Sequence, residues 1–110
     1  MQYNVVLSTP DELFVELSGE IDHHTSASIR DGIDVEIGRF RPKKLILDFG
    51  AVTFMDSSGI GLVMGRYRLI EPYGGIIELV NVPSPLRRVM HVAGLYKLAE
   101  IKEGGMVNAK

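Results

Sequence analysis

The sequence contains no cysteine, which excludes disulfides, zinc sites built from thiolates and a cysteine nucleophile. Its start lacks the basic segment and long apolar core of a secretory signal. No apolar run approaches the length that a helix needs to cross a bilayer. The formal net charge of -2 argues against nucleic-acid binding, for which a concentrated basic surface is typical. These absences suit a cytoplasmic protein with no membrane span and no nucleic-acid partner.

The chain has 110 residues, of which 45% are hydrophobic and 24% charged, as is ordinary for one globular domain. We expect residues 1–110 to form a single compact domain whose core extends from about residue 3 to residue 101. The tail that begins at Gly104-Gly105 is expected to fray. The free chain is expected to be a monomer.

Alternating apolar residues predict strands at 3–8 and 13–18, joined by turn residues as an antiparallel hairpin. Nearly continuous apolar runs at 44–49 and 76–80 predict strands buried on both faces, and a weak last strand is expected at 98–101. Helices are predicted between these strands, where apolar residues recur with helical spacing. The resulting order β-β-α-β-α-β-α-β predicts an α/β fold with a mixed sheet and helices packed on it.

The ends of the predicted helices are marked to different degrees. The first helix has competing starts at Asp22, Thr25 and Ser26, because all three are capping residues. The last helix has a clearer signature, in which Ser84 is the predicted cap and Gly94 the predicted end.

The segment Asp56-Ser57-Ser58 lies between the strand predicted at 44–49 and a helix whose apolar stripe starts at Ile60. Asp and Ser side chains cap helix starts, and the positive end of a helix tolerates added negative charge. The pattern therefore fits either a plain N-cap or a functional site. Gly59 and Gly61 favour a functional site, because glycine weakens the first turn and usually accompanies close approach of a ligand or partner.

The helix that follows carries two stripes. One extends from Ile60 to Tyr67 and is expected to face the sheet. Because a chain this small can hardly bury a helix all round, we expect the opposite stripe to face a protein partner, with Arg66 as an anchor. The predicted partner surface, including the helix start, consists of Ile60, Gly61, Leu62, Gly65, Arg66 and Leu69.

Two kinds of enzyme site are disfavoured by glycine spacing. Ser57 and Ser58 lack the pair of flanking glycines that a serine-hydrolase elbow requires. The glycines at 59, 61 and 65 match neither a Walker phosphate loop nor a dinucleotide loop.

A metal site is also disfavoured. Asp22, Asp48 and Asp56 could gather at one end of the sheet and hold Mg²⁺, or they could act as caps, which we favour. His23 and His24 are adjacent, so on a regular element they point in divergent directions and make poor joint ligands. We therefore expect neither a metal nor a cofactor.

The sequence resembles the STAS-domain anti-sigma factor antagonists from about residue 3 to residue 101. The phosphorylation loop of that family is similar to Asp56-Ser57-Ser58-Gly59-Ile60-Gly61, preceded by Leu45-Ile46-Leu47-Asp48 and Phe54-Met55. The sporulation branch of the family is similar at Gly19-Glu20-Ile21-Asp22-His23-His24-Thr25 and at Gly65-Arg66-Tyr67. The family commonly adds another helix beyond the position of Ile101.

The resemblance implies a switch and not an enzyme. Ser57 would be phosphorylated by a partner that is both an anti-sigma factor and a serine kinase. The unphosphorylated form would bind that partner in its nucleotide-bound state and release a sporulation sigma factor, and a serine phosphatase would reset the system. Asp22, Asp56, Ser58 and Gly59 would surround the phosphorylation site, and no catalytic residue is implied.

Three alternatives remain open. The chain could be a STAS switch of a related stress-response complex, with the same chemistry and a different partner. It could be a small hydrolase or nucleotide-binding enzyme that uses Asp22, Asp56 and Ser57. It could also be a structural interaction module whose binding is indifferent to phosphorylation.

Overall fold

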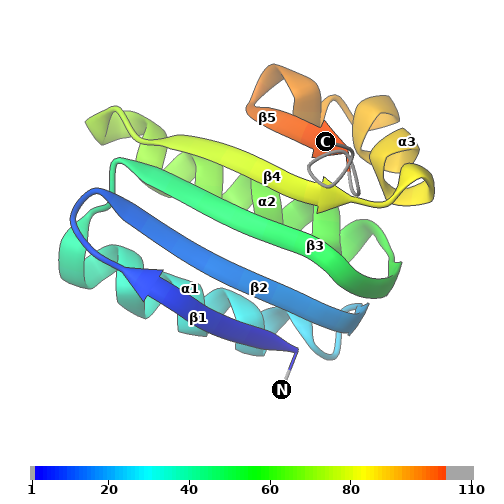
Figure 1. Ribbon diagram of the computed structural model, residues 1–110, viewed down its shortest axis with the longest axis horizontal. Helices are drawn as coiled ribbons and strands as arrows, with labels where there is room; N and C mark the ends of the chain where they lie inside the picture. Colours follow the sequence, from blue (N-terminus) through cyan, green and yellow to red (C-terminus); the bar gives the residue numbers. More distant parts are fainter. Residues whose placement is uncertain (1, 104–110) are drawn as a thin grey trace, which may run out of the picture.

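Five strands form one mixed sheet, in the order β1-β2-β3-β4-β5, in the computed structural model, which describes residues 2–103 (Figure 1). β1 is antiparallel to β2, and every other neighbouring pair is parallel. The strands are β1 (Tyr3–Ser8), β2 (Glu12–Ile21), β3 (Lys44–Met55), β4 (Ile76–Val82) and β5 (Ala99–Glu103).

Helices connect the parallel strands. They are α1 (Ser26–Phe40), α2 (Ser57–Ile70) and α3 (Ser84–Val92), with short 3₁₀ helices η1 (Glu71–Tyr73) and η2 (Leu95–Lys97). The predicted order of elements, the initial hairpin and the single compact α/β domain are therefore confirmed. No helix within residues 2–103 is long and apolar enough to cross a membrane. The tail predicted to fray from Gly104 lies outside the described residues.

The main core lies between the sheet and the helices α1 and α2, which lie behind the strands in Figure 1. Alternate residues of each strand point into this core, and the recurrent isoleucines of α1 meet them from the other side. The fully buried members of the core include Leu13, Val15, Leu45, Leu47, Phe49, Leu79, Ile29 and Ile33.

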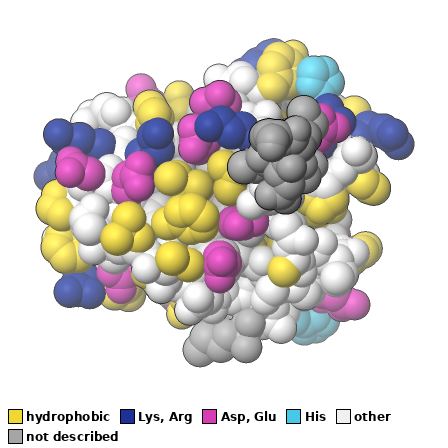
Figure 2. All heavy atoms as spheres, viewed as in Figure 1, with side chains coloured by type: hydrophobic (Ala, Val, Ile, Leu, Met, Phe, Trp, Pro, Cys, Tyr) yellow, Lys and Arg dark blue, Asp and Glu magenta, His cyan; other side chains and the backbone are white. Residues whose placement is uncertain are grey.

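Within residues 2–103 no helix lies on the opposite face of the sheet, and Figure 2 shows hydrophobic side chains gathered over its middle. Here Phe14 is the register partner of both Leu7 on β1 and Ile46 on β3. The alternation of Tyr3, Val5 and Leu7, from which the strand at 3–8 was predicted, would place Leu7 on the same face as the other two, and this is wrong. An irregularity between Val5 and Leu7 shifts the register, which leaves Leu7 43% exposed.

Several element boundaries also differ from the sequence prediction. β2 continues past residue 18 to Ile21, and β4 and β5 end two residues later than expected, at Val82 and Glu103. β3 extends to Met55 and not only to residue 49, because Val52 and Met55 continue to face the core after the Gly50-Ala51 irregularity. Ser84 is not the cap of α3. The helix already includes it, Pro83 stands in the cap position, and no side chain caps this end.

Two glycines of α1 offer a matched test of packing. A Cβ at Gly32 would overlap the ring of Tyr3, whereas a Cβ at Gly38 would meet nothing within 4 Å. Replacing glycine by alanine in a helix ordinarily stabilises it by about 1 kcal/mol. We expect Gly38→Ala to raise the free energy of unfolding by about 0.5–1 kcal/mol. Gly32→Ala should lower it by about 1–2 kcal/mol, because the overlap outweighs the gain in helix propensity. Urea denaturation of the two variants measures both values, and equal stabilisation would show that α1 does not pack on Tyr3 as described.

Candidate functional site

The segment between β3 and α2 forms a capped helix start, as predicted. Asp56 has extended backbone angles, and its carboxylate accepts a hydrogen bond from the N–H of Ser58 at 2.8 Å. Ser57 is the first residue of α2 and is exposed. Within residues 2–103 no hydrogen bond involves its hydroxyl, so this group is free to react at the positive end of the helix.

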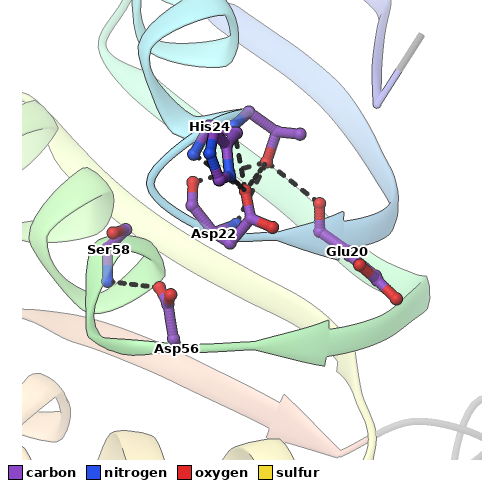
Figure 3. A network of polar contacts seen from close by, with 6 residues as sticks. Glu20, Asp22, His24, Asp56 and Ser58 are labelled. Atoms are coloured by element: carbon purple, nitrogen blue, oxygen red, sulfur yellow. Dashed lines mark hydrogen bonds and ion pairs between the residues drawn. The ribbon is translucent and has the colours of Figure 1, made fainter.

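A second loop, between β2 and α1, lies beside this one (Figure 3). The Asp22 carboxylate accepts from the N–H groups of His24 and Thr25 at 2.9 and 3.1 Å. The hydrogen bond from Thr25 contributes most to lowering the pKa of Asp22, followed by the one from His24. The Thr25 hydroxyl donates to the Glu20 carbonyl at 3.0 Å and accepts from the N–H of Asp22. This loop is therefore ordered by its own side chains.

The two loops meet because β2 and β3 are parallel neighbours. Ile21 and Met55 are register partners at the ends of these strands, and the N–H of Asp56 donates to the Ile21 carbonyl at 3.1 Å. Asp22 and Asp56 thus lie at the same end of the sheet, each holding backbone N–H groups of its own loop. The prediction that these aspartates act as caps is confirmed for Asp56. Asp22 does not cap α1, because Thr25 is the N-cap of that helix, no side chain caps it, and the N–H groups that Asp22 holds come before the helix.

The third predicted carboxylate lies elsewhere. Asp48 lies within β3, where it accepts from the N–H of Gly50 and from the Asn81 side chain at 2.8 and 3.1 Å. The suggested gathering of all three aspartates is therefore wrong. His23 and His24, predicted to diverge, have ring centroids 4.0 Å apart, because they lie in a loop and not on a regular element. The described residues contain no group of three side chains that could hold a metal ion.

Arg66 and Leu62 are not exposed, which corrects part of the predicted partner surface. Their exposed fractions are only 5% and 4%, because α1 packs against this side of α2. The Arg66 Nε lies 2.8 Å from Oδ1 of Asp34 on α1, close but not aligned for a hydrogen bond, so the contact is an ion pair. Burial lowers the pKa of Arg66 and raises that of Asp34. The opposite charge of the other residue in the pair opposes each of these shifts.

The rest of the predicted surface is accessible. Gly61 and Leu69 are exposed, and Ile60 and Gly65 are half-buried. A Cβ at Gly61 or Gly65 would meet nothing within 4 Å, so neither glycine is required by packing inside this chain. Ser58 is half-buried, whereas Gly59 is buried against Met55, where an added Cβ would overlap that side chain.

An apolar groove of about 690 Å³ runs beside Ser57, between α2 and α3. Sequence reasoning missed its α3 wall. The signal was present, because Arg88 and Val92 are four residues apart on the side of α3 opposite the buried Leu86 and Met90. The groove is lined by Met55, Asp56, Ser57, Ile60, Gly61 and Met64 on one side and by Arg88, Val89, Val92 and Ala93 on the other.

Comparison with known proteins places this geometry in a family. The sequence model of the STAS domain matches residues 3–104. The anti-sigma F factor antagonist of Paenibacillus polymyxa is 42% identical over 89 residues, which cover 81% of this chain and 76% of that protein.

Two solved structures of SpoIIAA share the fold. The unphosphorylated anti-sigma factor antagonist superposes with a TM-score of 0.79 at 33% identity, over 90% of this chain and 86% of its own. The phosphorylated Bacillus form gives 0.72 at 33% identity, over 90% and 89%. The chain therefore belongs to the STAS domain family and, within it, to the anti-sigma factor antagonists.

Proposed function

We propose that the chain is a serine-phosphorylation switch centred on Ser57. Unphosphorylated, it binds a nucleotide-bound anti-sigma factor that is also a serine kinase, and so releases a sporulation sigma factor. Phosphorylation of Ser57 by that partner ends the interaction, and a serine phosphatase restores it. The observation that carries this proposal is the exposed, unbonded hydroxyl of Ser57 at the first position of α2.

The named relatives support a sporulation partner over a stress-response partner. Anti-sigma F factor antagonists of Paenibacillus polymyxa and Lysinibacillus sphaericus are 42% and 35% identical to this chain. The anti-sigma-B factor antagonist of Bacillus subtilis is 27% identical. The stress-response role is the second candidate, and binding to purified sigma-F-type and sigma-B-type anti-sigma factors separates the two.

The electrostatics of the site suit such a switch. A phosphate adds a charge of about -1.5 to -2 at neutral pH. At a helix N-terminus this charge is stabilised by about 0.3–1 kcal/mol, so the domain itself need not rearrange. A partner surface has no such compensation, because it must desolvate the phosphate beside Asp22 and Asp56. A hundredfold loss of affinity requires only about 2.8 kcal/mol.

The proposed partner surface consists of Ser57 and the accessible face of α2, which includes Ile60, Gly61, Gly65 and Leu69. Leu62 and Arg66 are buried and do not form part of this surface. They support it by fixing α2 against α1. Gly61 and Gly65 weaken the helix without any packing need. Close approach by the backbone of a partner would explain their presence.

Substitution of the two serines tests the proposed phosphorylation site. Incubated with the kinase and ATP, Ser57→Ala should take up no phosphate, because the nucleophilic hydroxyl is gone, while still binding the partner. Ser58→Ala is the matched control and should be phosphorylated at Ser57, because the cap of α2 uses the Ser58 N–H and not its hydroxyl. Peptide mass spectrometry locates the phosphate. Normal phosphorylation of Ser57→Ala would remove the basis of the proposal.

Gly61→Ala tests the partner surface without damaging the fold. We expect it to stabilise α2 by about 0.5–1 kcal/mol, because alanine is the better helix former and its methyl group meets no neighbour. We also expect at least about tenfold weaker binding of the anti-sigma factor, equivalent to 1.4 kcal/mol, because the methyl group separates the two surfaces. Calorimetric titration and urea denaturation give the two values. Unchanged affinity in a stabilised variant would show that the partner does not bind at this face of α2.

A further inference from the structure

Arg88 lies on the α3 wall of the groove, opposite Ser57. It is exposed, and its guanidinium makes no ion pair or hydrogen bond within residues 2–103. Its neighbour Arg87 differs, because it is bound to Glu103 of β5 through an ion pair of 2.6 Å. Arg88 is also the one cationic residue in the lining of the groove that contains Ser57.

Ser57, at the first position of α2, is part of the lining of this groove. It shares one side of α2 with Ile60, Gly61 and Met64, at spacings of three, four and seven residues, and all four line the groove. A phosphate on the Ser57 hydroxyl would therefore project over the apolar lining toward α3. An exposed arginine can turn to meet it, because no other interaction of its own must be broken.

Carboxylates near Ser57 would repel a phosphate on its hydroxyl, and a cation in the groove would offset this repulsion. Asp56 lines the same groove, although its carboxylate is directed at the Ser58 N–H. Asp22 lies in the adjacent loop beside His24 (Figure 3). The helix start offsets only part of the repulsion between these carboxylates and a dianion. Arginine is suited to the remainder, because its planar guanidinium can bind two phosphate oxygens at once.

We propose that Arg88 binds the phosphate of phosphorylated Ser57 across the groove and thereby covers its apolar lining. This inference rests on the phosphorylation of Ser57 proposed above and adds a mechanism to it. The phosphate then acts in two ways. It brings negative charge to the partner surface, and with Arg88 it closes the groove to any apolar side chain of the anti-sigma factor.

The test uses protein in which phosphoserine is incorporated at position 57 during translation, so that no kinase is needed. The pKa of the phosphate is measured by ³¹P NMR titration. A nearby cation favours the dianion and lowers this pKa, so Arg88→Gln should raise it by about half a pH unit or more. Arg88→Lys keeps the charge but not the two-point contact, and should give an intermediate value.

Arg68→Gln is the control, because it removes the same charge from an exposed position in the last turn of α2. Its phosphate pKa should stay within about a tenth of a unit of the parent value, since exposed charges beyond about 8–10 Å are largely screened. Equal pKa values in Arg88→Gln and Arg68→Gln would overturn the inference. Failure of the kinase to phosphorylate the unmodified chain would instead overturn the proposed function and leave this measurement intact.

Discussion

The parallel pairing of β2 with β3 determines where the candidate site forms. The two strands remain register partners as far as Ile21 and Met55, and the Asp56 N–H closes the pair by donating to the Ile21 carbonyl. In a parallel pair the carboxyl ends of both strands meet at one edge, so the loops that follow them become neighbours. The other features of the site depend on this pairing of β2 with β3, which is the frame of the site. Asp22 orders one loop, Asp56 orders the other, and Ser57 follows Asp56 at the start of α2.

The same frame is compatible with the proposed phosphorylation of Ser57, because it would let a large charge be added without a change of fold. Ser57 is exposed in the first turn of α2 and is not a member of the hydrophobic core. A phosphate on its hydroxyl would therefore leave the buried contacts of the sheet unchanged. The solved SpoIIAA structures agree with this picture. One is unphosphorylated and one phosphorylated, and both share the fold of this chain, with TM-scores of 0.79 and 0.72. An effect of the proposed phosphate on Ser57 is therefore expected at the surface, where α2 faces α3.

Local patterns in the sequence were sufficient for the order of elements and for the cap at Asp56, because periodicity and capping depend on neighbouring residues. They failed where the structure depends on contacts between segments that are distant in the sequence. The stripe containing Arg66 looked exposed, and only the packing of α1 reveals Asp34 as its partner. The α3 side of the groove was missed for the same reason, since nothing local links Arg88 to Ser57. Leu7 was misplaced because one irregularity in β1 inverts the faces of the residues beyond it.

That irregularity also bears on how the sheet ends. β1 and β5 are its edge strands, and an edge with regular unpaired N–H and C=O groups invites another chain to add a strand. The bulge near Val6 interrupts this ladder where β1 is most apolar, with Val6 and Leu7 53% and 43% exposed. At the other edge, the part of β5 within the described residues, Ala99–Glu103, carries the charged, exposed Glu100 and Lys102. Both edges thus carry features that oppose the addition of a strand from another chain, a bulge on β1 and charged side chains on β5.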